Sequence, residues 1–413
     1  MTPRPLTQNI VPGSPPPDLG AYRSAGGYQS VAHLTPAEII AIVADSGLAG
    51  CGGGGFSTGR KWQAMPPKSS RPGPRYFIVN ADEMEPGTFK DRTLMEGDPH
   101  LLIDGIRLAA YAVEADTAYI FIRGEYLTAI ARLEHAIAEA GAAGLLGDLT
   151  IHIHAGAGRY ICGEETALLN SLEGGRAIPR AKPPLPQISG LWGHPTIVNN
   201  VETVCNIPHI VRHGAAWYRG LGLGAEAGTK IFGVSGRVNR PGAYELPVGT
   251  PLRTLIEDCA GGMIDGYSLR AVLPGGASTG FLDASMLDTS LSAAAMSAAG
   301  TRLGTGNVIV LDDATCPIGF IANLQHFFAQ ESCGWCAPCR DGLPWIEQIL
   351  RALESGNGED SHLALLAEMP AQLGPGRTFC GLAPGAMASL QTGLTLFRDD
   401  FTRHVTEKSC AWH

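Results

Sequence analysis

Four cysteines in the C-terminal quarter of the chain have the spacing needed to hold an iron–sulfur cluster. Cys333, Cys336 and Cys339 are each separated by two residues, and Cys380 follows about forty residues later. A [4Fe–4S] cluster takes four thiolate ligands, and C-x2-C-x2-C plus one distant cysteine is a common way to supply them. Because the four irons form a tetrahedron, a tight loop can reach three of them and the fourth thiolate comes from elsewhere. The pattern therefore indicates a chain that carries single electrons.

Zinc and disulfide bonds are the alternative interpretations of these cysteines. Structural zinc sites usually pair two C-x2-C units, or one C-x2-C with two histidines, whereas here three cysteines are clustered and one is alone. Disulfides need an oxidising compartment. The chain begins with Met1-Thr2-Pro3-Arg4, without the apolar core of an export signal. The cluster is the interpretation that the spacing favours.

A glycine-rich loop between Gly50 and Trp62 is the second candidate site. It contains G-x-G-x-x-G, but a dinucleotide-binding turn should follow a strand and open a helix, and here a helix is predicted before the glycines. We expect a loop whose bare backbone N–H groups approach a phosphate or a flat ring, with Lys61 as a countercharge. The alternative is a flexible loop with no chemical role.

Polar segments follow the predicted strands, at positions where open parallel sheets bind ligands. They are the acidic run 80–87, the segment 156–166, the basic segment 179–184 and the amide-rich segment 199–203. Surface turns and helix ends are the alternative explanation, since carboxylates at a helix start complement its dipole without any function. Cys162 has no partner cysteine nearby, so we expect it to be a small buried residue. The histidines show no metal-binding spacing.

Length and composition limit the possible classes of protein. The chain has 413 residues, 45% of them apolar and 17% charged, which is typical of a globular protein with two or three domains. A net charge of −9 argues against nucleic acid as a partner. No apolar run is long enough to span a bilayer, so we expect a cytoplasmic chain without direct membrane insertion.

The order of the predicted elements suggests an extended N-terminal arm at 1–33, an α/β domain at 34–225, a β-rich domain at 226–316 and a helical bundle at 317–413. In the second segment, strands and helices alternate, which predicts a parallel sheet between helices. The predicted strands are 76–79, 118–122 and 150–154. A first helix is predicted to start at Pro36, with Thr35 as its N-cap and Glu38 completing a capping box, and further helices are predicted at about 98–115, 126–140 and 164–173.

These motifs together resemble the flavin-binding, NADH-oxidising subunit of respiratory complex I (the F-subunit of bacterial NADH:quinone oxidoreductase). The resemblance extends from about residue 18 to 401. It rests on Gly53-x-Gly55-Phe56-Ser57-Thr58-Gly59-x-Lys61-Trp62, Asn80-Ala81-Asp82-Glu83-Met84-Glu85-Pro86-Gly87-Thr88, Tyr160-Ile161-Cys162-Gly163-Glu164-Glu165-Thr166, Val198-Asn199-Asn200-Val201-Glu202-Thr203 and the cysteine run. The resemblance implies a Rossmann-like FMN domain, a small ubiquitin-like β-grasp domain of the SLBB type and a C-terminal helical bundle carrying the cluster.

The resemblance also implies the cofactors and their ligands. FMN would be held by Gly50, Gly52, Gly53, Lys61, Asn80, Asp82, Glu83, Gly163, Glu164, Asn199, Asn200 and Thr203. The substrate NADH would contact Phe56, Glu85, Glu165 and Lys182. A hydride would pass from NADH to FMN, and single electrons would continue through the [4Fe–4S] cluster on the four cysteines towards quinone. No side chain need act as a general acid or base.

The same resemblance implies that the chain works inside a larger complex. Its partners would be the [2Fe–2S] E-subunit and the multi-cluster G-subunit, in the peripheral arm on the cytoplasmic side of the inner membrane.

Several positions depart from the pattern of this family. Ala49 and Cys51 stand where arginines usually flank the first loop glycine, which removes positive charge near the FMN phosphate. Leu185 replaces a phenylalanine, so an aromatic contact with NADH is lost. Gly54 and Ala64 replace a small and a larger apolar residue. We expect these changes to alter affinity more than chemistry.

Two other functions are compatible with these residues. The chain could be the diaphorase subunit of a soluble NAD-linked formate dehydrogenase or NAD-reducing hydrogenase, which share the FMN, NADH and cluster motifs. It could instead be a binding or structural protein with a degenerate flavin pocket, for which Ala49 and Cys51 are the only support. The proteins that purify with the chain would separate the first two functions, and flavin content would test the last.

Overall fold

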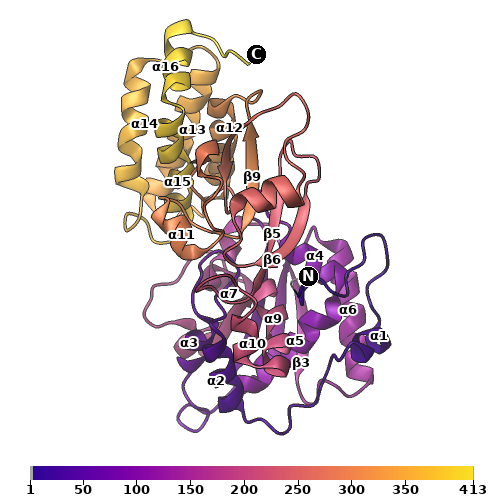
Figure 1. The fold of residues 1–413 in the computed structure, drawn as a ribbon. Coiled ribbons are helices and arrows are strands. Elements are labelled where there is room, and N and C mark those ends of the chain that lie inside the picture. The colour runs from indigo at the N-terminus through magenta and orange to yellow at the C-terminus, as the bar shows by residue number, and fades with distance from the viewer. Residues whose placement is uncertain (1–2, 413) are drawn as a thin grey trace. The chain divides into compact units, whose positions relative to one another are not determined.

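A computed structural model describes residues 3–412, and the chain divides into two compact units. Unit 1 comprises residues 1–84, 89–231 and 245–249, and unit 2 comprises residues 85–88, 232–244 and 250–413. The two units are described separately below, with the element labels of Figure 1.

Unit 1 alternates strands and helices, as the sequence predicts. Its helices are α1 (Leu19–Ser24), α2 (Pro36–Ser46), α3 (Thr58–Gln63), α4 (Lys90–Gly97), α5 (Pro99–Ala112), α6 (Leu127–Ala142), η1 (Tyr160–Gly163), α7 (Glu165–Leu172), α8 (Pro186–Ser189), η2 (Leu191–Gly193), α9 (Val201–His213) and α10 (Ala215–Arg219). Its strands are β1 (Tyr76–Ala81), β2 (Thr117–Arg123), β3 (Thr150–Gly156) and β4 (Thr196–Asn200).

The strands of unit 1 form one four-stranded sheet in the order β3-β2-β1-β4, and each adjacent pair is parallel. In β1, the consecutive residues Phe77, Ile78 and Val79 are fully buried, so both faces of the sheet are covered. Such a continuous apolar run is typical of a parallel strand between two layers of helices. The predicted Rossmann-like α/β class is confirmed for this unit.

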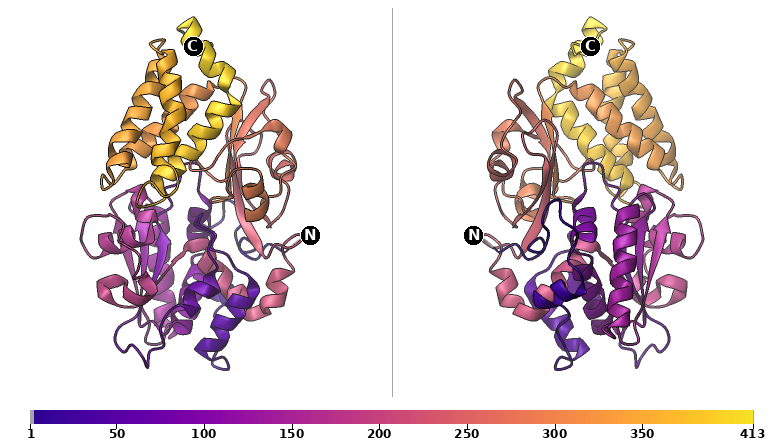
Figure 2. Two further views of the ribbon diagram at one scale, coloured as in Figure 1. Left: turned by 90° about the vertical axis from the view of Figure 1, so that its left-hand side faces the viewer. Right: turned by 90° about the vertical axis from the view of Figure 1, so that its right-hand side faces the viewer.

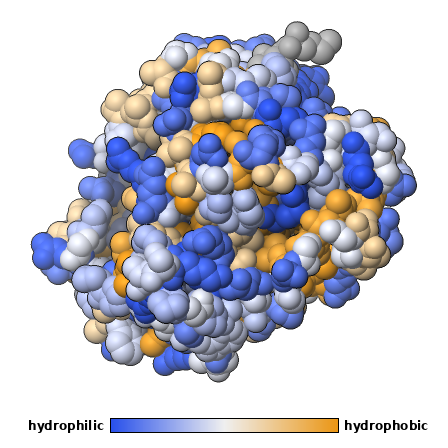
Figure 3. All heavy atoms as spheres, turned by 90° about the horizontal axis from the view of Figure 1, so that it is seen from below, coloured by the Kyte–Doolittle hydropathy of each residue, from blue (hydrophilic) through white to orange (hydrophobic). Residues whose placement is uncertain are grey.

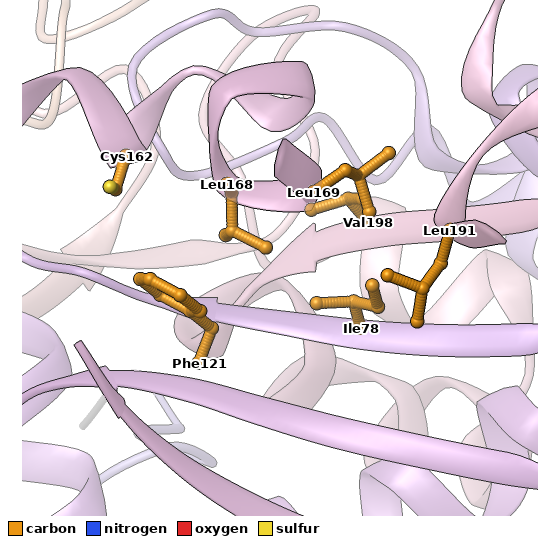
Figure 4. Close-up of a cluster of buried hydrophobic side chains, with 7 residues drawn as sticks. All are labelled: Ile78, Phe121, Cys162, Leu168, Leu169, Leu191 and Val198. Carbon is orange, nitrogen blue, oxygen red and sulfur yellow. The ribbon is translucent and has the colours of Figure 1, made fainter. Parts of the chain in front are cut away.

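One face of the sheet packs against α7 and its neighbours. Figure 4 shows this core, in which Cys162 lies with Phe121, Leu168 and Val198. Helices α5 and α9 contact β1 on the sheet. The prediction that Cys162 is a small buried core residue is confirmed.

A local capping signal sets the start of helix α2. Thr35 caps α2, with a reciprocal capping box to Glu38 and Pro36 at the first helical position. The segment predicted as an extended arm also contains α1, and its Leu6 and Tyr22 are buried. The N-terminal residues therefore pack on unit 1.

Unit 2 holds most of a mixed five-stranded sheet in the order β6-β5-β9-β7-β8. The strands are β5 (Thr229–Ser235), β6 (Gly242–Pro247), β7 (Leu269–Leu273), β8 (Leu282–Asp283) and β9 (Asn307–Asp312), with η3 (Thr254–Cys259), η4 (Ala284–Met286) and α11 (Ala293–Ala298) between them. β5 and β9 are parallel, whereas β7 pairs antiparallel with β8 and β9. This is the predicted small β-rich domain.

The C-terminal part of unit 2 is a bundle of helices that run side by side (Figure 2). They are α12 (Pro317–Glu331), α13 (Ala337–Glu354), α14 (Asp360–Leu373), α15 (Leu382–Leu396) and α16 (Arg398–Glu407). Leu343, Ile346 and Leu350 form the buried stripe of α13, as their spacing predicts. The predicted helical bundle is confirmed.

Over residues 3–412, no helix is both long and apolar enough to cross a membrane. Figure 3 shows one face of the molecule, on which hydrophilic side chains predominate and apolar ones gather in a few patches. Scattered apolar patches of this kind are usual on protein surfaces.

Candidate functional site

The carboxyl ends of two neighbouring strands bring three asparagines together in unit 1. Asn199 and Asn200 end β4, and the parallel register places them beside Val79 and Asn80 of β1. The Asn80 amide donates to the carbonyl of Gly163 at 3.0 Å, which ties the strand end to η1. Four of the predicted FMN ligands therefore lie at one edge of the sheet, where parallel sheets bind ligands.

The glycine-rich loop is closed at its base and docked on helix α9. Ala49 and Ser57 form an isolated antiparallel bridge, and the Gly50 N–H donates to the Phe56 carbonyl at 2.8 Å. The Cys51 N–H donates to Thr203 Oγ1 at 2.9 Å. The side chain of the predicted ligand Thr203 thus holds the backbone of the loop in place.

The tip of this loop and Gly163 of η1 face open space, whereas Gly50 and Gly52 at the base of the loop pack against neighbouring atoms. Gly53 and Gly55 have φ values of +103° and +63°, in the left-handed region that favours glycine. A Cβ built on Gly54, Gly55 or Gly163 would meet no atom within 4 Å. Bare backbone with room in front of it is what the phosphate and ring of FMN require, so the residues present fit this cofactor.

Two lysines and two glutamates form an ion-pair chain across the same region. Lys61 Nζ lies 2.6 Å from Glu165 Oε2, and Lys182 Nζ lies 3.1 Å from Glu165 Oε1 and 2.9 Å from Glu164 Oε1. Burial favours the neutral acid at Glu165, but the attraction of Lys61 and Lys182 outweighs it and lowers the pKa of that carboxyl. Glu165 is therefore ionised at neutral pH, and the chain of ion pairs offers both cations and acceptors to a ligand.

Glu164 has a second role, because it caps helix α7. Its Oε2 accepts from the backbone N–H groups of Thr166 and Ala167 at 3.0 and 2.9 Å. The sequence predicts a helix that starts at Glu164, where carboxylates complement the helix dipole. The structural role of Glu164 is thus present alongside any contact with a cofactor.

The acidic loop after β1 is held by a helix start. The Glu83 carboxylate accepts from the N–H groups of Asp91 and Arg92 at 2.7 and 3.0 Å and from the Tyr126 hydroxyl at 3.1 Å. Burial and the nearby Asp91 carboxylate raise the pKa of Glu83 to about 7. The loop is therefore anchored through Glu83, while Asp82 beside it is also buried.

A buried ionic cluster beneath the glycine loop was not predicted from the sequence. Lys90 Nζ lies 2.7 Å from Asp91 and 2.9 Å from Glu202, and Lys230 Nζ lies 2.7 Å from Glu202. Lys230 also donates to the Cys51 carbonyl at 3.4 Å. Glu202 belongs to a quoted motif and Lys90 follows the acidic loop, but only the fold brings Lys230 to them.

The remaining two predicted NADH contacts, Glu85 and Phe56, belong to different units. Glu85 belongs to unit 2, where its carboxylate accepts from the Ser278 N–H at 2.6 Å. Phe56 belongs to unit 1, at the end of the glycine loop, and 63% of its surface is exposed. An exposed ring of this kind is available for stacking on a flat ligand.

The four predicted cluster cysteines lie in unit 2 at the starts of two helices. Cys333 lies between α12 and α13, Cys336 caps α13, Cys339 is in its first turn, and Cys380 precedes α15. The Phe379 N–H donates to Cys336 Sγ at 3.3 Å, which brings the distant cysteine's segment to the loop. Helix N-termini carry partial positive charge, which suits an anionic group.

Burial and neighbouring thiolates affect the titration of one of these cysteines. Burial, then the charges of Cys333 and Cys336, raise the pKa of Cys339, so crowded thiolates need a cationic partner. Among residues 3–412, the group of potential ligand atoms that all lie within 4.8 Å of one another is a different one.

Comparison with known proteins gives the family of the chain. The F-subunit of NADH-quinone oxidoreductase from Salmonella typhimurium is 51% identical over 415 residues, covering 98% of this chain and 93% of that protein. The chain belongs to the F-subunit family. The F-subunit of Escherichia coli is also 51% identical, and the second F-subunit of Rhizobium meliloti is 47% identical over 96% of both chains.

Family models place the characteristic regions of the F-subunit along this chain. The Nuo51 FMN-binding domain matches residues 43–209, the SLBB domain matches 231–282, and the NADH-ubiquinone oxidoreductase-F iron-sulfur binding region matches 319–404. The fold class, the FMN and [4Fe–4S] cofactors and the oxidoreductase class predicted from the sequence are confirmed. As a member of this family, the chain is part of a multi-subunit assembly.

A solved NAD⁺-reducing [NiFe]-hydrogenase, in its H2-reduced state, contains a similar chain. It matches with a TM-score of 0.82 and 36% identity over 91% of this F-subunit, and the match spans 63% of the hydrogenase chain. The air-oxidised state of that enzyme matches with a TM-score of 0.80.

Proposed function

We propose that this chain is the electron-input subunit of a respiratory NADH:quinone oxidoreductase. It binds NADH and FMN in unit 1 and passes single electrons to a [4Fe–4S] cluster in unit 2. The observation that carries this proposal is the gathering of open glycine backbone, strand-end asparagines and the Lys61–Glu165–Lys182 chain at one sheet edge. FMN, when bound, supplies the conversion between a hydride donor and a one-electron acceptor.

The chain's own residues position the cofactor. The loop glycines Gly50, Gly52 and Gly53, together with Gly163, present backbone to it, and Lys61, Asn80, Asp82, Glu83, Glu164, Asn199, Asn200 and Thr203 supply or hold the polar contacts. Two of these residues are tied to helix starts. Glu83 accepts from the first turn of α4, and Thr203, in the first turn of α9, accepts from the Cys51 N–H. No side chain is required to move a proton, since orientation and exclusion of water are the protein's share.

The substrate NADH is held by charge and by one exposed ring. Lys182 and Glu165 form a pair at 3.1 Å that can exchange partners with the phosphates and hydroxyls of a dinucleotide. Phe56 offers an exposed face for stacking. We assign Glu85 to the same substrate.

Cys333, Cys336, Cys339 and Cys380 are the proposed ligands of the cluster, and the proposed boundaries are 1–33, 34–225, 226–316 and 317–413. The matched family regions each fall inside one of the last three segments. The proposed partners are the [2Fe–2S] E-subunit and the multi-cluster G-subunit, and the proposed place is the peripheral arm on the cytoplasmic side of the inner membrane.

A test uses the full chain reconstituted anaerobically with FMN, iron and sulfide. We expect about one FMN and four irons per chain, bleaching of flavin absorbance when NADH is added, and NADH-dependent reduction of ferricyanide. A protein that retains FMN yet leaves NADH unoxidised would contradict the proposal. A colourless protein would instead support the alternative of a degenerate flavin pocket.

A second candidate is the diaphorase subunit of a soluble NAD-linked hydrogenase or formate dehydrogenase. The match to the NAD⁺-reducing [NiFe]-hydrogenase, with a TM-score of 0.82, favours it. The 51% identity to the Salmonella typhimurium F-subunit over 93% of that protein favours the respiratory complex. Affinity purification of the tagged chain distinguishes the two, since a soluble host brings a hydrogenase or dehydrogenase subunit and the respiratory complex brings membrane subunits.

A further inference from the structure

A buried group of four metal-ligating side chains lies in the helical bundle of unit 2. It consists of Cys316, Glu354, His404 and Cys410, whose potential ligand atoms all lie within 4.8 Å of one another. None of them is a proposed ligand of the iron–sulfur cluster. We propose that these four residues form a second metal centre, a structural zinc site.

The donor set is that of a closed zinc site. Two thiolates, one imidazole nitrogen and one carboxylate oxygen make four ligands of the types that Zn²⁺ takes in tetrahedral geometry. Cys316, Cys410 and His404 are 7%, 8% and 0% exposed, so solvent has little access. A site with four protein ligands and no open position is structural rather than catalytic.

The distances already approach those of a metal tetrahedron. Cys316 Sγ lies 2.8 Å from Glu354 Oε1 and 3.5 Å from His404 Nε2, and His404 Nε2 lies 3.1 Å from the same Glu354 oxygen. Metal–ligand bonds of about 2.0–2.3 Å give tetrahedron edges of roughly 3.3–3.8 Å. Small outward movements of the side chains, largest for the partly exposed Glu354, would admit the ion.

The histidine is oriented for coordination. His404 Nδ1 lies 2.8 Å from the Asp400 carbonyl oxygen within α16, so this nitrogen carries the hydrogen and donates. Nε2 is then the free lone pair, and it faces Cys316 and Glu354. A backbone carbonyl bound to the second ring nitrogen is the usual way to fix a metal-binding imidazole.

The surrounding backbone is shaped to bring the ligands together. A Cβ on Gly319 would lie 2.7 Å from Glu354 Oε2, so the carboxylate lies directly against the backbone at the start of α12. Gly356 has φ +76°, and a Cβ there would lie 2.1 Å from the Lys408 carbonyl, which shows how closely the end of α16 approaches α13. Both glycines allow close approach between the segments that carry the four ligands.

The segment after α16 is held in place by Trp412, two residues beyond Cys410. The Trp412 indole N–H donates to the Asp313 carbonyl at 3.0 Å, and its ring stacks on His404 with centroids 6.2 Å apart. A zinc ion would join the start of α12, the end of α13, α16 and this C-terminal segment. Binding displaces the thiol protons to solvent, and the binding energy adds to folding stability.

The test measures metal content of the full-length chain, purified anaerobically with its iron–sulfur cluster. We expect about one zinc per chain in addition to the cluster iron. Cys316→Ala and Cys410→Ala should lose the zinc and retain the iron, whereas the matched control Cys259→Ala, in the same unit, should retain both. Glu354→Gln should weaken zinc binding at least tenfold against a competing chelator.

Cobalt replacement reports the ligands independently. Co²⁺ added to the zinc-free wild-type chain should give thiolate-to-cobalt charge-transfer bands and the visible bands of tetrahedral Co²⁺, and Cys410→Ala should reduce the former. The wild-type chain should also melt at a higher temperature with zinc than after chelation. The cobalt bands and the melting shift of the wild-type chain remain decisive if a cysteine variant does not fold.

Three results would overturn the zinc site. One is a cluster-loaded wild-type chain that takes up neither zinc nor cobalt. Another is zinc that persists in Cys316→Ala but disappears in Cys336→Ala, since that zinc belongs to unloaded cluster cysteines. The third is a Cys316–Cys410 disulfide in peptides from the anaerobic protein, because a disulfide leaves no thiolate for the metal.

Discussion

Replacing Glu202 by glutamine should destabilise unit 1 strongly. Glu202 is 0% exposed, and its carboxylate accepts from Lys90 at 2.9 Å, from Lys230 at 2.7 Å and from the Ile231 N–H at 2.7 Å. Glutamine keeps the shape but removes the one carboxylate that contacts both buried ammonium groups, and Lys230 is left without its partner. Removing one partner of a buried pair costs about 3–5 kcal/mol. For a unit of this size, we expect the melting temperature to fall by roughly 10 °C.

An exposed ion pair supplies the control. Lys68 and Asp116 lie 3.2 Å apart, with 40% and 61% of their side chains exposed, so Asp116→Asn should cost about 1 kcal/mol or less. The double variant Glu202→Gln with Lys230→Met removes the charge together with one partner. It should recover part of the loss, because the remaining Lys90–Asp91 pair is balanced.

The pH dependence gives the sign of the effect. Burial raises the pKa of Glu202, but Lys230 and Lys90 outweigh it and the net pKa is lowered. A carboxyl with a depressed folded pKa contributes stability above its unfolded pKa, and this contribution is lost as the pH falls through the folded value. The gap between wild type and Glu202→Gln should therefore be constant near neutral pH and narrow in acid.

Hydrogen exchange of peptides from β1 and β4 is the appropriate assay, because the chain has two units and one melting curve need not report either of them. Exchange protection in these strands should fall in Glu202→Gln and stay unchanged in Asp116→Asn. Equal protection in wild type and Glu202→Gln at neutral pH would refute the role of the ionic cluster.

Three further outcomes are expected at the proposed binding sites. Cys336→Ala should abolish the paramagnetic signal of the reduced cluster while flavin is retained; an intact signal would exclude this ligand. Lys182→Ala should raise KM for NADH about tenfold with a smaller change in kcat, since a charged hydrogen bond contributes about 1.5–3 kcal/mol, and an unchanged KM would remove Lys182 from the substrate site. Gly163→Val should place a side chain in the open space and reduce bound FMN at least tenfold, whereas Gly141→Ala, on the surface of α6, should not; equal flavin content in the two would place FMN elsewhere.

Periodicity and capping predicted the strands β1, β2 and β3 and the helices α2, α5, α6 and α7 of unit 1, because these signals are local. Thr35 and Glu38 set the start of α2, and the apolar run at Tyr76–Val79 identified β1. The strand β4 was not predicted, because its second half is Asn199 and Asn200, which are poor strand formers. The neighbouring strand β1 supplies the hydrogen bonds that keep these residues extended.

The candidate site was predictable to the extent that its residues stand in short motifs. The glycine loop, the acidic loop and the C-x2-C-x2-C run are each contiguous in the chain, so the types and spacing of their residues identify them. The ionic cluster and the Cys316 group combine residues that are far apart in the chain. Lys230 is 28 positions from Glu202. Cys316 is 88 positions from His404, so no short sequence motif contains both.

The buried ionic cluster does not replace the positive charge of the arginines that the resemblance predicts on either side of Gly50. Ala49 and Cys51 remove two cations from the loop, but Lys230 donates to the Cys51 carbonyl and is itself neutralised by Glu202. Lys90 and Lys230 balance Asp91 and Glu202, so this cluster adds no net charge for a phosphate. The Cys51 N–H is occupied by Thr203, and burial raises the pKa of the Cys51 thiol to about 11, so that side chain stays neutral. Lys61 is likewise paired with Glu165, so attraction for an anionic cofactor must come mainly from the remaining loop N–H groups. Flavin affinity in this chain should accordingly depend on backbone geometry more than on side-chain charge.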